Sequence, residues 1–149
     1  MVIDGAKGIE SQTKKLFEIC RLRDLPIITF CNKMDRESRD FIDIIDEIQE
    51  NLAIDVAPIN WPIGSGKDFS GCFNILEETF EPLEKQNRNL KVDSLKADVS
   101  SKNKILNYIS SVKADKLFEE LEMIKELLPS FDLKAFREGS QTPIWFGSA

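Results

Sequence analysis

The first part of the chain alternates short apolar runs with stretches whose residues recur at helical spacing. Val2 and Ile3 form the first apolar run, which ends at Asp4 and a glycine-containing turn. A helix is predicted from Glu10 or Ser11 to Arg23, because its inward positions recur three and four residues apart. Those positions are Ile9, Thr13, Leu16, Phe17 and Cys20. The segment 24–26 contains a proline and ends this helix.

A second apolar run covers residues 26–31 and is partly β-branched, which is typical of a parallel strand buried on both faces. It ends abruptly at the polar residues 32–36. The next helix is the clearest in the sequence, with Asp40 as its predicted N-cap. One apolar stripe contains Phe41, Ile44, Ile45, Ile48 and Leu52. The order strand, helix, strand, helix predicts an α/β fold with a parallel sheet and right-handed crossovers.

The rest of the chain follows a different pattern. Residues 56–64 contain two prolines and are predicted to be extended, and two short antiparallel strands are predicted at 69–76 and 79–83. The polar stretch 84–103 has no sustained period and is interpreted as a loop or weakly ordered insert. Later elements are a helix over 114–128, a short helical segment over 132–137 and a buried strand over 142–146. This organisation predicts a small inserted α+β subdomain at 64–129, between segments 1–63 and 130–149.

Composition limits the classes of function. Hydrophobic residues make up 42% and charged residues 31% of the 149 positions, which is ordinary for a globular protein. No apolar run approaches the ~20 residues that span a membrane, and the N-terminus has no signal-peptide pattern. The net charge of −6 argues against broad contact with a nucleic-acid backbone, so no DNA partner is expected. With no histidine, His-dependent nucleophilic catalysis and most zinc sites are excluded.

The three cysteines, Cys20, Cys31 and Cys72, are odd in number and widely spaced. We interpret them as small buried side chains in a reducing, cytoplasmic compartment.

The motif with the clearest chemistry is Asn32-Lys33-Met34-Asp35, directly after a predicted strand. Ligands of parallel sheets sit at the carboxyl ends of strands. The Asp35 carboxylate can accept hydrogens from N1 and the 2-amino group of a purine base, and the Asn32 amide can meet the N7 edge. The aliphatic stem of Lys33 can lie over the ring while its ammonium stays in water. The same pattern also fits a plain turn in which Asn32 and Asp35 cap the next element.

These residues resemble known motifs. Asn32-Lys33-x-Asp35 is similar to the guanine-specificity motif of the GTPase superfamily, and Ser148-Ala149 to its later element, whose backbone amide contacts the guanine keto oxygen. Residues 2–10, 21–36, 57–64 and 142–149 resemble translational GTPases, most of all their bacterial release-factor branch. The resemblance implies the C-terminal part of a P-loop GTPase domain, a parallel sheet with flanking helices. Its guanine-binding residues would be Asn32, Lys33, Asp35, Ser148 and Ala149, with no catalytic residue and no metal ligand.

The sequence also departs from that family. Its phosphate-binding loop, first-switch threonine, Asp-x-x-Gly motif and second-switch histidine are all missing here. The string Gly64-Ser65-Gly66-Lys67-Asp68 does not replace the first of these, because Trp61 stands at the first glycine position and Asp68 at that of the hydroxyl. We interpret residues 64–68 as the turn into the inserted hairpin.

We therefore expect a fragment of a longer protein, one that keeps guanine recognition but does not hydrolyse GTP, because phosphoryl transfer depends on the missing parts. For the longer protein the resemblance implies GTP or GDP with magnesium as ligands. Its implied partners are the ribosome and the class I release factors, which it would remove by GTP binding and hydrolysis, and no membrane partner is expected. Alternatives are a GTPase like elongation factor G, a tetracycline-protection GTPase, or an isolated protein-interaction module without a nucleotide role.

Overall fold

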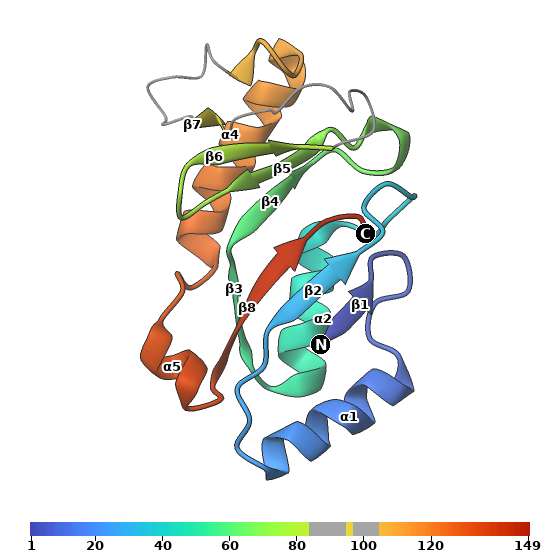
Figure 1. Cartoon of the computed structure of the whole chain (residues 1–149), viewed down its shortest axis with the longest axis vertical. Coiled ribbons are helices and arrows are strands. Elements are labelled where there is room, and N and C mark those ends of the chain that lie inside the picture. The colour runs from blue at the N-terminus through green and yellow to red at the C-terminus, as the bar shows by residue number, and fades with distance from the viewer. Residues whose placement is uncertain (84–94, 97–104) are drawn as a thin grey trace.

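The computed structural model describes residues 1–83, 95–96 and 105–149, and it contains two four-stranded sheets (Figure 1). The first sheet is parallel throughout, with the strand order β1 (Val2–Asp4), β2 (Thr29–Asn32), β8 (Gln141–Phe146) and β3 (Asp55–Pro58). The second sheet is antiparallel, with the order β4 (Asn60–Ile63), β5 (Gly71–Asn74), β6 (Thr79–Pro82) and β7 (Leu95–Lys96). The predicted α/β class with a parallel sheet and flanking helices is confirmed.

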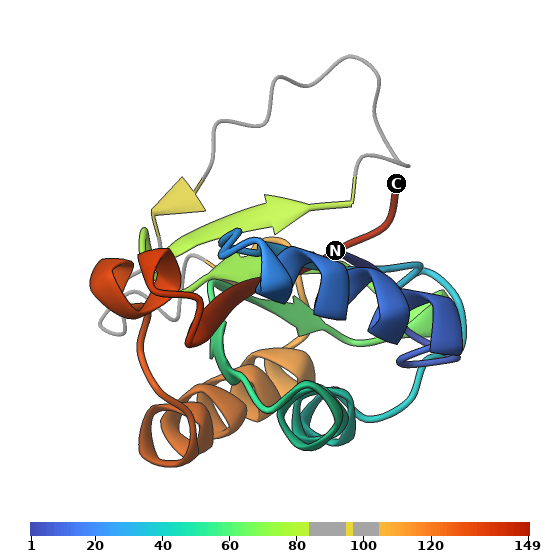
Figure 2. The ribbon, with the colours of Figure 1, turned by 90° about the horizontal axis from the view of Figure 1, so that it is seen from below.

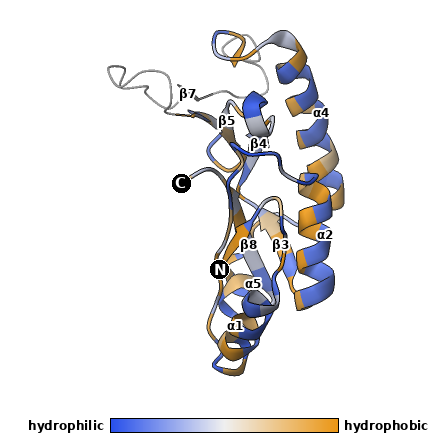
Figure 3. Ribbon diagram, turned by 90° about the vertical axis from the view of Figure 1, so that its right-hand side faces the viewer, coloured by the Kyte–Doolittle hydropathy of each residue, from blue (hydrophilic) through white to orange (hydrophobic). Residues whose placement is uncertain are grey.

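The helices follow the predicted periodicity. Helix α1 (Ser11–Leu22) connects β1 to β2, and α2 (Phe41–Leu52) follows β2. Asp40 caps α2 as predicted, because its side chain accepts a hydrogen bond from the Ile42 backbone. The remaining helical elements are η1 (Gly66–Asp68), α4 (Ser111–Leu127) and α5 (Leu133–Arg137). Figures 2 and 3 show α2 and α4 along the same side of the two sheets.

The parallel sheet is covered unequally on its two faces. Ile3, Cys31 and Ile144 are fully buried. Neighbouring positions alternate outward, so that Phe30 is only half-buried and Val2 is 64% exposed. The prediction that the second strand is buried on both faces is therefore wrong for this chain, because Ile28 is 52% exposed and Phe30 is only half-buried.

The second sheet begins earlier than the sequence indicated. Strand β4 pairs with β5 from Asn60 to Ile63, so these four residues belong to the antiparallel sheet. The predicted strand pair β5 and β6 is confirmed. Within the stretch predicted to be a loop, residues 95–96 form strand β7, and residues 84–94 and 97–104 lie outside the described part. No helix in the described part is long and apolar enough to cross a membrane.

Candidate guanine-binding site

The two candidate base-recognition segments meet at one edge of the parallel sheet. Strands β2 and β8 are parallel neighbours, with Cys31 opposite Phe146, so both end at the same edge (Figure 1). The backbone continues the contact beyond the strands: Gly147 N–H donates to Cys31 O at 3.0 Å, and Met34 N–H donates to Gly147 O at 3.1 Å. The loop 32–35 and the segment 147–149 therefore lie against each other, although 113 residues separate Asp35 from Ser148.

Polar side chains join the two segments directly. The Ser148 hydroxyl donates to Asp35 Oδ1 at 2.5 Å. The Asn32 Oδ1 accepts from the Lys33 backbone at 2.8 Å and from the Ala149 backbone at 3.0 Å. Because both contacts use the amide oxygen of Asn32, the amide NH₂ is the part of that side chain suited to an acceptor such as N7. All five residues singled out from the sequence are thus brought together.

The Ala149 N–H has a partner within the protein. It donates to Asn32 Oδ1 at 3.0 Å, and the resemblance implies that the backbone amide of the Ser148-Ala149 element also contacts the guanine keto oxygen. To contact a keto oxygen, the N–H must exchange this partner or share its proton between two acceptors.

Lys33 has an ionic partner that the sequence did not predict. Its ammonium was expected to stay in water; the side chain is 42% exposed, and Lys33 Nζ lies 2.6 Å from Asp4 Oδ2, at the end of β1. Asp4 is the residue that sequence reasoning missed. The available signal was that both β1 and β2 end in a polar residue, and the structure pairs these two, Asp4 and Asn32, in register. The hydrogen bond from Lys33, followed by that from the Ala6 backbone, lowers the pKa of the Asp4 carboxyl.

The lowered pKa of Asp4 gives a prediction for acid stability. A carboxyl whose pKa is depressed by folding stabilises the native state fully above its unfolded value, here 3.8, and loses this contribution as the pH falls through its folded value. We expect the difference in unfolding free energy between the wild type and Asp4→Asn to be constant above about pH 5 and to shrink below pH 3.8. Urea unfolding at a series of pH values measures this difference, and a difference that grows towards low pH would contradict it.

The loop 32–35 is held in place by the buried Met34 side chain and by the turn that follows β4. Met34 is fully buried, and a Cβ atom on Gly5 would clash with Met34 Cε. Gly66 N–H donates to Met34 O at 2.9 Å. The string 64–68 thus leads into the antiparallel hairpin, as predicted, and its Gly66 backbone supports the base-recognition loop.

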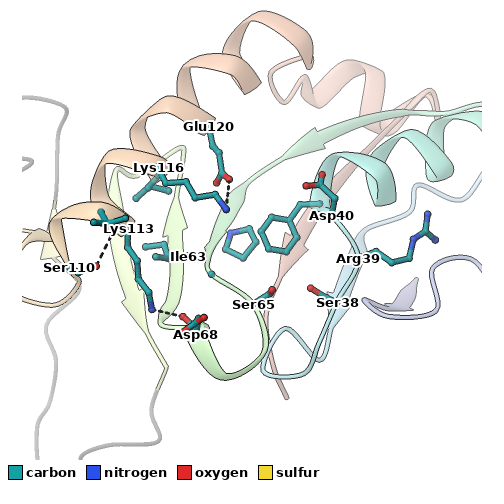
Figure 4. Close-up of a pocket in the computed structure, with 15 residues that line it drawn as sticks. Ser38, Arg39, Asp40, Ile63, Ser65, Asp68, Ser110, Lys113, Lys116 and Glu120 are labelled. Atoms are coloured by element: carbon teal, nitrogen blue, oxygen red, sulfur yellow. Dashed lines mark hydrogen bonds and ion pairs between the residues drawn. The ribbon is translucent and has the colours of Figure 1, made fainter.

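A cavity of about 570 Å³ lies elsewhere, between the start of α2, residues 62–68 and α4 (Figure 4). None of the five candidate guanine-binding residues lines it. Two of its lysines have partners within the protein: Lys116 pairs with Glu120 at 3.6 Å, and Lys113 donates to the backbone carbonyl of Asp68 at 2.7 Å. This cavity is therefore separate from the candidate base site.

Other reactive groups do not form a second site in the described part of the chain. The three cysteines are free thiols, and burial raises the pKa of Cys31 and Cys72 to about 12, which makes them poor nucleophiles at neutral pH. Among the described residues, no three His, Cys, Asp or Glu side chains cluster so as to hold a metal ion.

Comparison with known proteins defines the class. All of residues 1–149 match the family described as Elongation factor Tu GTP binding domain, and the chain belongs to this family of GTP-binding domains. The sequence-based assignment to the translational GTPases is confirmed.

Within this class, the chain resembles one particular factor. It is 46% identical over 151 residues to peptide chain release factor 3 of Aromatoleum aromaticum (strain DSM 19018 / LMG 30748 / EbN1). This match covers 99% of this chain and 27% of that protein. It is 42% identical over 149 residues to peptide chain release factor 3 of Microcystis aeruginosa (strain NIES-843 / IAM M-2473), covering 100% of this chain and again 27% of that protein. The chain thus spans about a quarter of the length of these curated relatives.

A solved structure from Thermus thermophilus shows the same fold. The two chains superpose with a TM-score of 0.62 at 14% sequence identity, over 98% of this chain and 23% of the other. This likeness supports the arrangement of sheets and helices described above.

Proposed function

We propose that this chain is a segment of a longer translation-termination GTPase, called here the parent protein, and that it supplies the recognition of the guanine base. The observation that carries the proposal is the meeting of residues 32–35 and 147–149 at the carboxyl edge of β2 and β8, tied by the bond between Ser148 and Asp35. The relatives that share this sequence are named peptide chain release factor 3 and are almost four times as long.

The site's chemistry fits a guanine base. Asp35 presents a carboxylate, the group that can pair with both N1–H and the 2-amino group. Asn32 has already fixed its amide oxygen on two backbone donors, so its NH₂ is oriented without cost at the moment of binding. Lys33 contributes a long aliphatic stem that can cover one face of the ring.

The residues of this chain fit the base of the nucleotide but not its phosphates. The sequence has no Gly-x-x-x-x-Gly-Lys-Ser/Thr motif, and the Gly66 amide is used to support Met34. The parent protein is proposed to hold the phosphates and magnesium with residues outside this segment. It would act in the cytoplasm, on the ribosome, and release class I release factors through GTP binding and hydrolysis.

One face of the parallel sheet is incompletely covered, which supports the proposal that the rest of the nucleotide site lies in another part of the parent protein. Val2 is 64% and Ile28 is 52% exposed, and their positions in the strand pattern place them on the same face as Phe30. Exposed apolar groups on one face of a sheet are typical of a surface that packs against another part of a protein. We propose that another part of the GTPase domain covers this face in the parent protein.

The domain boundaries are proposed with one adjustment to those drawn from the sequence. Segments 1–63 and 130–149 were predicted to form the GTPase part, with 64–129 as the insert. Because β4 is hydrogen-bonded within the antiparallel sheet, we propose that the inserted subdomain begins at Asn60.

The segment by itself is expected to bind GDP no more tightly than millimolar and to release no phosphate from GTP. Each charge-assisted hydrogen bond contributes about 1.5–3 kcal/mol, whereas millimolar affinity already requires about 4 kcal/mol. Calorimetry with GDP and a phosphate-release assay with GTP measure both quantities, with the parent protein as the positive control. Micromolar binding or steady turnover by the segment would show that it contains a phosphate site.

A further inference from the structure

We infer that Asp4 is a positioning residue for base binding: it holds Lys33 so that the aliphatic stem of Lys33 is fixed as one wall of the base site. This inference deepens the proposed function and rests on it. Asp4 itself is the last residue of β1 and is not one of the residues that the guanine motif contains.

One oxygen of the Asp4 carboxylate is held by the backbone of its own turn, and the other contacts Lys33. Its Oδ1 accepts hydrogen bonds from the backbones of Ala6 at 2.9 Å and Lys7 at 3.3 Å. The other oxygen, Oδ2, receives the Lys33 ammonium at 2.6 Å. The side chain of Asp4 is only 15% exposed. One oxygen therefore anchors the carboxylate to its turn, and the other is directed to the neighbouring loop.

The two loops are also joined through their backbones. Asp4 and Asn32 are paired in register at the ends of β1 and β2, and the Gly5 N–H donates to Asn32 O at 3.0 Å. The strand pairing and this hydrogen bond therefore hold Asp4 beside Asn32, the residue that precedes Lys33. A rigid partner of this kind is needed if an ion pair is to set the direction of a side chain with four rotatable bonds.

The backbone of Lys33 gives a second, independent observation. Its φ of +70° lies in the left-handed region, which is unfavourable for a residue with a Cβ. Such conformations persist where the surrounding structure enforces them, and they concentrate at ligand sites. Lys33 combines this constrained backbone with the ion pair to Asp4, so both its backbone and the end of its side chain are held.

The consequence for binding is pre-organisation. A free lysine side chain loses rotamer freedom when a ligand orders it, whereas one already held by Asp4 loses little. The ion pair also occupies the ammonium, so Lys33 contributes mainly apolar cover over a flat ring. Because every purine has such a face, Asp4 should affect the affinity for the base and not the choice between bases.

A double-mutant cycle in the parent protein tests this role, with GDP affinity measured by calorimetry. Asp4→Asn keeps an oxygen for Ala6 and Lys7 but removes the charge that holds Lys33. We expect it to weaken GDP binding about 3- to 10-fold, the range expected when one side chain loses its pre-organisation. Lys33→Met keeps an apolar stem without the ammonium. In that background we expect Asp4→Asn to change GDP affinity by less than about 2-fold.

Two further measurements separate positioning from general damage to the loop. The thermal midpoint of Asp4→Asn at neutral pH should stay within about 3 °C of the wild type. In an Asp35→Asn background, Asp4→Asn should weaken the binding of xanthosine diphosphate by the same factor as it weakens GDP in the wild type. The inference is overturned if Asp4→Asn leaves GDP affinity unchanged, or weakens it equally with and without Lys33.

Failure of the proposed function can be distinguished from failure of the role of Asp4. If the parent protein does not bind GDP, or if Asp35→Asn does not alter its choice of base, the guanine site is wrong and the role of Asp4 is lost with it. If Asp35→Asn alters the choice of base while Asp4→Asn leaves GDP affinity unchanged, only the role of Asp4 is wrong.

Discussion

Asp35→Asn in the parent protein is expected to reverse the nucleotide preference from guanine to xanthine. Asp35 is an acceptor-only group, suited to N1–H and the 2-amino group of guanine. Xanthine has a carbonyl in place of that amino group, so the wild-type site would bring two acceptors together. The asparagine amide supplies a donor to this carbonyl and no longer pairs with the amino group of guanine.

The expected change in preference is large, because buried polar groups are left unpaired when the wild type binds xanthine or the variant binds guanine. Each such group costs about 1–3 kcal/mol, so two of them correspond to a change of roughly 10²- to 10⁴-fold in the ratio of affinities. Competition between GDP and xanthosine diphosphate measures this ratio. Ser148→Ala is the matched control, since it removes the bond to Asp35 but not the carboxylate. It should weaken both nucleotides without reversing the order.

The outcomes for Asp35→Asn distinguish reading the base from holding the loop. A variant that loses both nucleotides equally would mean that Asp35 serves mainly to tie residues 32–35 to Ser148. A variant with both affinities unchanged would mean that the base does not contact Asp35 at all.

Asn60→Ala is expected to destabilise the fold by about 1–3 kcal/mol, the cost of one buried backbone N–H left without an acceptor. Asn60 is buried and clamps the end of β8: its Oδ1 accepts from Phe146 N–H at 2.7 Å, and its Nδ2 donates to Phe146 O at 3.0 Å. The Cys72 thiol also donates to this carbonyl, at 3.1 Å. Removal of the amide leaves the Phe146 N–H without its acceptor, directly before the segment 147–149.

Urea unfolding followed by tryptophan fluorescence measures this loss of stability. Asn51→Ala is the matched control, because Asn51 is exposed and its side chain donates to the Glu47 carbonyl within the same helix. It should change stability by less than about 0.5 kcal/mol. If the two variants are equally stable, the clamp on Phe146 does not hold the second sheet to the end of β8.

The parts of the structure that could be predicted from the sequence are those with a local signal. The apolar stripe of α2 and its cap Asp40 predict that helix almost to the residue. The carboxyl-end rule for parallel sheets predicts that residues 32–35 and 147–149 meet, because both follow apolar strands. Family resemblance then supplies the identity of the base.

The parts that could not be predicted depend on partners far away in the chain. The pairing of Lys33 with Asp4 requires the register of β1 and β2, which no local pattern contains. The assignment of β4 to the second sheet depends on pairing with β5, since prolines and β-branched residues suit either sheet. The start of α4 at Ser111 was placed too late, because residues 111–113 lie off its buried stripe, and its cap is Ser110.

The most direct test of the account is a crystal structure of the parent protein bound to GDP. We expect the guanine base at the carboxyl edge of β2 and β8, with the Asp35 carboxylate at hydrogen-bond distance from N1 and the 2-amino group, and with the Lys33 stem over the ring. A base bound elsewhere, for example in the cavity between α2 and α4, with no contact to Asp35, would contradict the central claim.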